Sequence, residues 1–272
     1  MSLVHIPPAP RLAVEHAGAG ALVVFLHGIG GNRRNFLRQV EAVAAAGFHA
    51  AAWDARGYGE SEDYEGELDF ADFSRDLVRV LEYFSVEAAH VVGVSMGGLI
   101  AQDFYRRHPR RVRSLVLAGT RNGYARTNAA EFLKRREAPL LAGLAPRDIA
   151  AELAPTLASR SAPQAVLAQL RESIAALHKE SYLKALRTTT RIGEQPGYSG
   201  RDCYVDLKTV AVPALVVCGT EDGVTPPELS RSLAAGIPAA KLQMIESAGH
   251  LCNIEQPEAF DAALLQFLQS VR

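Results

Sequence analysis

The segment Val91–Gly98, with the sequence VVGVSMGG, constrains the fold more than any other part of the chain. A β-branched, apolar run ends there at Ser95, which lies between two glycines and is followed by an amphipathic stretch. The pattern predicts a buried strand that turns sharply into a helix, with the serine at the turn. Gly93 and Gly97 leave room for the close packing that such a turn requires. The hydroxyl of Ser95 would then be exposed at the end of a strand, where a base can reach it.

Apolar, β-rich runs alternate with helical patterns along most of the chain, which predicts an α/β fold with a mostly parallel central sheet flanked by helices. The expected strands are 22–26, 48–53, 90–94, 114–118, 214–218 and 241–245, and the expected helices are 35–46, 70–85, 96–108, 227–235 and 257–271. Residues 2–16 are expected to add an antiparallel hairpin. The alternation stops between residues 121 and 201, where Ala, Leu, Arg and Glu dominate. Residues 1–120 and 202–272 are therefore predicted to form the core, and residues 121–201 an inserted helical cap over the pocket.

Three further segments supply the groups that a nucleophilic serine needs. An apolar run leads into Asp222 before a proline-started helix, and His250 lies on a loop near the C-terminus. His250 is predicted to act as the base and Asp222 to orient it, whereas Glu221 should point away because side chains alternate along extended backbone. The first buried strand ends in a glycine-rich loop. The backbone N–H groups of Ile29 and Met96 are therefore the expected donors to an oxyanion.

The order of serine, aspartate and histidine along the chain, together with the run DARGYGES at residues 54–61, resembles the α/β-hydrolase superfamily over essentially the whole length. Within it, the segments FLHGIGGNRRNF, GVSMGGLIAQDF and AGHLCNIEQPEAF resemble the 3-oxoadipate enol-lactonase and carboxylesterase group. Those lactonases often carry Ser-Asn where this chain has His27 and Gly28, so ester and lactone substrates both stay open. A serine at the turn also differs from haloalkane dehalogenases and the usual epoxide hydrolases, which use an aspartate there.

The residues and the resemblance together predict a serine hydrolase that cleaves a carboxylic ester or lactone of a small molecule through an acyl-enzyme. Two alternatives keep the same residues: a carbon–carbon bond hydrolase of a vinylogous diketone, and a ligand-binding or receptor-type protein with slow turnover. Neither a metal nor an organic cofactor is expected. Arginines near the expected pocket mouth are candidates to bind an acidic substrate, and they are Arg33, Arg34, Arg121 and Arg126. Arg121 is the first choice because it follows a strand at its C-terminal end.

The charge balance favours neither a nucleic-acid nor a membrane partner, since 29 basic and 30 acidic residues give a net charge of −1. No apolar run approaches the length that spans a membrane. Three cysteines, an odd and sparse count, and the absence of a basic and apolar leader favour reduced thiols in a cytoplasmic protein. Cys252 lies close to His250 in the sequence, and we interpret it as a small apolar packing residue.

Overall fold

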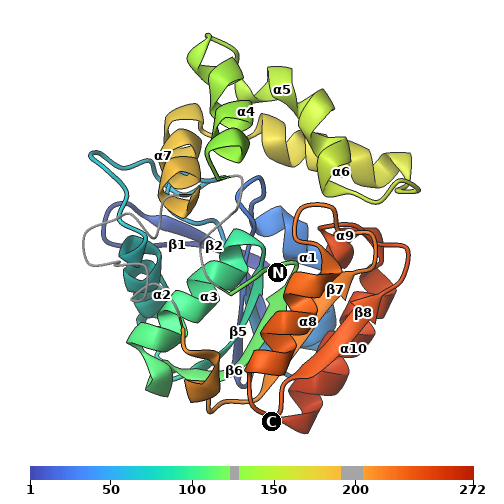
Figure 1. The fold of residues 1–272 in the computed structure, drawn as a ribbon. Helices are drawn as coiled ribbons and strands as arrows, with labels where there is room; N and C mark the ends of the chain where they lie inside the picture. Colours follow the sequence, from blue (N-terminus) through green and yellow to red (C-terminus); the bar gives the residue numbers. More distant parts are fainter. Residues whose placement is uncertain (123–128, 191–204) are drawn as a thin grey trace.

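The computed structural model describes residues 1–122, 129–190 and 205–272 (Figure 1). Within these residues eight strands form one sheet in the order β1-β2-β4-β3-β5-β6-β7-β8. The strands are β1 Ser2–Ile6, β2 Leu12–Gly18, β3 Leu22–Leu26, β4 His49–Trp53, β5 Ala89–Val94, β6 Val112–Ala118, β7 Ala214–Gly219 and β8 Lys241–Ile245. β1 pairs antiparallel with β2, and β2 with β4, whereas the strands from β4 to β8 pair in parallel. The predicted α/β fold with a mostly parallel sheet is confirmed.

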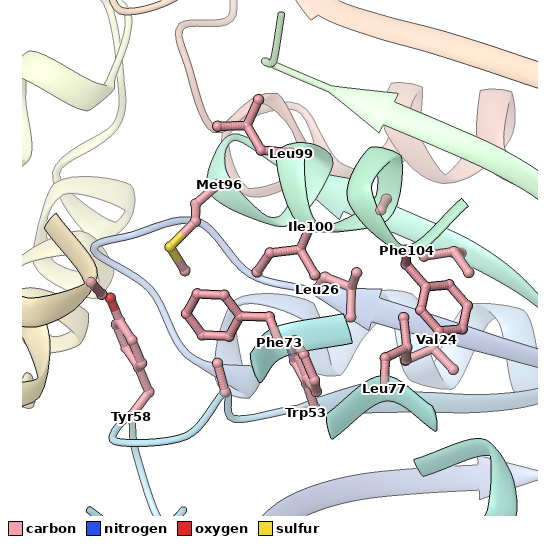
Figure 2. Close-up of a cluster of buried hydrophobic side chains, with 14 of the residues drawn as sticks. Val24, Leu26, Trp53, Tyr58, Phe73, Leu77, Met96, Leu99, Ile100 and Phe104 are labelled. Carbon is pink, nitrogen blue, oxygen red and sulfur yellow. The ribbon is translucent and has the colours of Figure 1, made fainter. Parts of the chain in front are cut away.

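Helices cover both faces of this sheet. They are α1 Leu37–Ala45, α2 Ala71–Tyr83, α3 Met96–Arg107, α8 Pro227–Gly236, the short α9 Cys252–Glu255 and α10 Pro257–Ser270. Alternate residues of β3 serve the two faces: Val24 and Leu26 pack with α2 and α3, whereas Val23 and Phe25 pack with α1 and α10. Burial on both faces explains why β3 reads as a continuous apolar run. Figure 2 shows the first of these clusters, with side chains from β3 (Val24, Leu26), α2 (Phe73, Leu77) and α3 (Ile100, Phe104).

A run of helices separates β6 from β7 in the sequence, and we call it the helical insertion. It comprises α4 Ala129–Leu141, α5 Pro146–Leu153, α6 Gln164–Ala175 and α7 Lys179–Thr190. In Figure 1 these helices lie together above one end of the sheet. β6 and β7 are hydrogen-bonded neighbours, so the insertion leaves and returns on adjacent strands. The cap boundaries at 121 and 201 stay a prediction, and residues 123–128 and 191–201 of that stretch lie outside the described residues.

The loop after β3 is fixed by a capped turn that the sequence analysis merged with the next helix. A 3-10 turn at Arg33–Phe36 precedes α1, whereas a single helix over 35–46 was expected. The side chain of Asn32 accepts the N–H of Arg34, and that of Asn35 accepts the N–H of Asn32, each at 3.0 Å. This reciprocal capping satisfies donors that a helix start leaves unpaired. These bonds fix the segment that directly follows the loop carrying Ile29. None of the helices in the described parts of the chain is long and apolar enough to cross a membrane.

Candidate active site

Ser95 lies at a sharp turn between β5 and α3, as the sequence predicted. Its backbone has φ 56° and ψ −116°, a conformation that is strained for a residue with a side chain. A Cβ at Gly97 would lie 2.0 Å from the carbonyl oxygen of Leu26, and a Cβ at Gly93 would lie 2.2 Å from that of Gly97. Only glycine fits these two positions, so α3 can approach β3 and β5 closely. The hydroxyl of Thr120 donates to the carbonyl of Ser95 at 2.9 Å and helps to hold the turn.

Asp222 and His250 are in direct contact. Nδ1 of His250 lies 2.9 Å from Oδ2 and 3.1 Å from Oδ1 of the carboxyl. The carboxyl also accepts the N–H groups of Val224 and Thr225, each at 2.8 Å, and the hydroxyl of Thr225 at 2.6 Å. Burial alone would raise the pKa of Asp222, but the charge of His250 and these hydrogen bonds lower that pKa below its ordinary value. Asp222 is therefore a carboxylate that accepts the Nδ1–H, which leaves Nε2 of His250 to accept a proton.

The neighbouring carboxylate, Glu221, points away from His250. It is exposed, and its Oε2 accepts the N–H of Arg160 in the helical insertion at 3.3 Å. Asp222, in contrast, is only 3% exposed. The two neighbouring acids therefore lie in different surroundings, and only Asp222 contacts His250.

Ser95 and His250 line one cavity of about 70 Å³ beneath the helical insertion. Ile29 and Met96, the expected oxyanion donors, line it too. A Cβ at Gly28 would lie 3.2 Å from the Cβ of Ser95, so the main chain that leads to Ile29 runs directly beside the serine. Among the described residues, the N–H groups of Ile29 and Met96 donate to no backbone acceptor. Both donors are thus available to an oxygen beside Ser95.

The serine and the histidine share the cavity without a hydrogen bond between them. In the described structure, Nδ1 of His250 faces Asp222 and Thr225, and the hydroxyl of Ser95 has no hydrogen bond to the ring. Such contacts between a nucleophile and its base often tighten only when substrate binds. The arrangement therefore brings Ser95, His250 and the two expected oxyanion donors to one cavity. The hydrogen bond between Ser95 and His250 would form when a substrate binds there.

A buried carboxylate, which the sequence did not single out, holds the loop that carries His250. Glu255 accepts the N–H of Gly249 at Oε1 and the N–H of Ser159 at Oε2, each at 2.8 Å. The N–H of His250 itself donates to the carbonyl of Leu157 at 3.1 Å. Ser159 and Leu157 belong to the helical insertion. The insertion and the histidine loop are therefore tied together through main-chain groups.

His27 shapes the loop that leads to Ile29. Its ring is buried, its Nδ1–H donates to the carbonyl of Gly28 at 2.8 Å, and its Nε2 accepts the N–H of Ala55 at 3.1 Å. Burial lowers the pKa of His27 in spite of the hydrogen bond to Gly28. A neutral ring with both nitrogens engaged is a structural link rather than a base.

The four candidate arginines differ in their surroundings. The guanidinium of Arg33 is 2.6 Å from both Asp54 and Glu60, and this pairing leaves it unavailable to a substrate. Arg34 is largely exposed and lies 3.6 Å from Glu60. Arg121 lines the catalytic cavity. Arg126 lies outside the described residues.

Cys252 packs as a small buried side chain. It is 1% exposed among the apolar residues under α10, and burial raises the pKa of its thiol above the ordinary value. In the parts of the chain that the structure describes, no cluster of three or more His, Cys, Asp or Glu side chains is placed to hold a metal ion.

Comparison with known proteins matches residues 21–257 to the family described as alpha/beta hydrolase fold. A Mycobacterium tuberculosis protein named as the non-heme bromoperoxidase BpoC is 32% identical, over 96% of this chain and 99% of its own. The structure of a thermophilic esterase from Thermogutta terrifontis, described as malate bound, has a TM-score of 0.88 at 28% identity and covers 100% of this chain and 99% of its own. The enol-lactonase from Burkholderia xenovorans LB400 has a TM-score of 0.84 at 24% identity, with 95% and 96% covered. The resemblance that the sequence predicted is confirmed for the superfamily and the fold.

Proposed function

The chain belongs to the alpha/beta hydrolase fold family, and we propose that it hydrolyses a carboxylic ester or lactone of a small molecule through an acyl-enzyme on Ser95. One observation carries this proposal. Ser95, at a strained strand-to-helix turn, faces the same cavity as His250, whose Nδ1 is held by a buried carboxylate. A hydroxyl, an imidazole with a free Nε2 and two unpaired N–H donors at one cavity are the parts that acyl transfer needs.

In the first step, Oγ of Ser95 attacks the carbonyl carbon of the substrate while Nε2 of His250 takes the hydroxyl proton. The carbonyl electrons move to the oxygen, which accepts hydrogen bonds from the N–H groups of Ile29 and Met96, with the N-terminus of α3 behind it. Asp222 keeps the Nδ1–H oriented and stabilises the imidazolium. The intermediate then collapses, and the alkoxide leaves with the proton from His250. Water next loses a proton to His250 and attacks the acyl carbon, which releases the acid and restores Ser95.

We propose that the helical insertion acts as the cap, over residues 121–201, and sets which acyl and alcohol groups fit. The groups that perform the chemistry come from loops at the ends of core strands, which say nothing about substrate size. The insertion supplies the other side of the cavity. Its described lining residues are Arg121, Phe132, Arg136, Leu157, Thr189 and Thr190. We further propose that the protein acts on small molecules in a reducing compartment, the cytoplasm, since Cys218 and Cys252 are free, buried thiols.

A fluorophosphonate probe tests the nucleophile directly. It should label one serine of the native protein, and peptide mapping should locate the adduct on Ser95. The variant Ser95→Ala should lose the labelling and lose kcat by orders of magnitude, while its unfolding temperature stays near that of the wild type. Labelling of a different serine, or turnover of Ser95→Ala close to that of the wild type, would refute the proposal.

A substrate panel separates the proposed reaction from its alternatives. It contains short acyl esters, an enol-lactone and a vinylogous diketone. Hydrolysis of esters or the lactone, with a burst of the first product, supports the acyl-enzyme. Cleavage of the diketone alone would indicate a carbon–carbon bond hydrolase. Stoichiometric capture of a ligand with little product would indicate a receptor-type protein.

A further inference from the structure

A buried guanidinium at the catalytic cavity has an edge without a protein partner. Arg136, on α4, is 8% exposed and lines the cavity that holds Ser95 and His250. Within the described residues, its Nη1 is buried and has no hydrogen-bond partner. The central carbon of the guanidinium lies 4.6 Å from the centre of the Phe132 ring. Contact with a ring face leaves the N–H groups at the guanidinium edge available.

A second unpaired donor lies on the neighbouring helix of the insertion. Thr189, on α7, lines the same cavity, and its Oγ1 is buried without a hydrogen-bond partner. α7 packs against α4, which carries Arg136. The two helices therefore present a cation and a hydroxyl to one cavity. A carboxylate has two oxygens that accept from such a pair.

The charge of the cavity lining points to an anion. The described lining residues include two arginines, Arg121 and Arg136, and no Asp or Glu. A buried cation without a counter-charge is costly, whereas a buried cation is tolerated when an anion pairs with it. Among the described residues, no side chain supplies that anion to Nη1 of Arg136. Since no described Asp or Glu lines the catalytic cavity, an anionic ligand that enters it would supply the counter-charge.

Arg136 also lies at the route by which a substrate chain would extend away from the serine. Arg136, Phe132 and Val224 line both the catalytic cavity and a second cavity of about 430 Å³. The catalytic serine and the oxyanion donors come from core loops, whereas Arg136 comes from the insertion on the other side. A group held by Arg136 would therefore belong to the end of the substrate that is remote from the reacting carbonyl.

We propose that Arg136, together with Thr189 of the same cavity, binds a carboxylate of the substrate, so that the substrates are small esters or lactones that carry a free carboxylate. Half-esters of dicarboxylic acids and lactones with a carboxylate side chain belong to this class. This inference rests on the proposed ester or lactone hydrolysis by Ser95. It goes beyond that hydrolysis by naming the charge of the substrate and the side chain that binds the charged group.

Two esters of similar length that differ in charge provide the kinetic test. One is the 4-nitrophenyl monoester of succinic acid, which is an anion at pH 7, and the other is neutral 4-nitrophenyl butyrate. Arg136→Gln should lower kcat/KM for the anionic ester by about 10- to 100-fold, mainly through KM, because it removes a charge-assisted hydrogen bond. The neutral ester should lose far less, about threefold or less. Thr189→Val should lower kcat/KM for the anionic ester by about 2- to 10-fold.

Two other arginines serve as controls on the same substrates. Arg135→Gln removes an exposed cation next to Arg136 that lines the second cavity and not the catalytic one, so both esters should react as with the wild type. Arg121→Gln tests the other cation of the catalytic cavity. Equal losses for the two esters in Arg136→Gln, no loss for either ester, or a selective loss in Arg121→Gln alone would each overturn the assignment of Arg136.

A binding measurement keeps the inference testable if neither ester is hydrolysed. Glutarate should raise the unfolding temperature of the wild type, whereas glutaramide, its neutral diamide, should not. The rise should disappear in Arg136→Gln, whose own unfolding temperature should be equal to or above that of the wild type, since an unpaired buried charge is removed. An equal rise with glutarate in Arg136→Gln would overturn the inference. Absence of labelling at Ser95, with the glutarate response intact, would instead refute only the proposed hydrolysis.

Discussion

The replacement Glu255→Gln tests whether the tie between the helical insertion and the histidine loop supports catalysis. The carboxylate of Glu255 is 6% exposed and accepts two main-chain N–H groups, those of Gly249 and Ser159, at 2.8 Å each. Glutamine has nearly the same size but only one acceptor oxygen. One of the two N–H groups would then face an amide N–H₂ group, and it would be buried without a partner.

The expected loss follows from that single contact. A hydrogen bond to a charged group contributes about 1.5–3 kcal/mol to stability. Since each kcal/mol shifts the unfolding temperature of a chain of this size by about 2–4 °C, Glu255→Gln should unfold about 3–12 °C lower. The loop that carries His250 would be held less tightly, and a displacement of about 1 Å at a catalytic group can cost about 100-fold in rate. We expect kcat for a short ester to fall by about 10- to 100-fold, with little change in KM.

Glu221→Gln is the matched control. Its carboxylate also accepts an N–H of the insertion, that of Arg160, but it is exposed and the distance is 3.3 Å. Its change in stability should stay within about 0.5 kcal/mol. Calorimetric unfolding and steady-state kinetics of both variants decide the matter. If Glu255→Gln matched Glu221→Gln in unfolding temperature and kcat, the reasoning about the tie would be wrong.

Two further predictions concern the acid and a buried histidine. Asp222→Asn should lower the acylation rate on the order of 10³- to 10⁴-fold, because the amide favours the wrong tautomer of His250, and a burst assay that found a smaller loss than for Glu221→Gln would contradict the assignment. Burial lowers the pKa of His90 from 6.5 to about 4. Between pH 6.5 and pH 4, His90 is protonated in the unfolded chain but neutral in the native state. The free energy of unfolding is therefore highest above about pH 6.5 and falls by up to about 3 kcal/mol towards pH 4. Urea unfolding between pH 4 and 7 should show a shallower decline for His90→Asn, and parallel curves would rule out His90 as its source.

The strands could be predicted because their signal is local. β3 and β8 begin and end at the predicted residues, Leu22–Leu26 and Lys241–Ile245. Burial on both faces makes β3 a short apolar run, whereas β8 lies at the end of the sheet and is exposed over its first three residues. The turn at Ser95 and the position of Asp222 at the end of a strand can also be predicted from neighbouring residues in the sequence. These features need no knowledge of distant contacts.

The remaining site residues depend on partners far along the chain. Glu255 reads as an ordinary helix residue until Ser159, almost a hundred positions earlier, is known to lie against it. Arg33 was a reasonable substrate ligand by position, but Asp54 and Glu60 pair with it in the folded chain. Arg136 is one of many arginines in an amphipathic stretch, and only its unpaired Nη1 distinguishes it. Pairing, or the lack of it, is a tertiary property that a single sequence does not display.

The helical insertion leaves and returns on neighbouring strands, β6 and β7, so the sheet keeps its connections whatever chain is spliced between them. The helical insertion of another family member could therefore replace this one as a unit. Such an exchange should change the range of substrates without changing the sheet. Two main-chain groups limit this modularity. The carbonyl of Leu157 and the N–H of Ser159 complete the hydrogen bonding around His250 and Glu255. An exchanged insertion that lacks an acceptor and a donor at these two points would change the specificity but leave His250 displaced from its catalytic position.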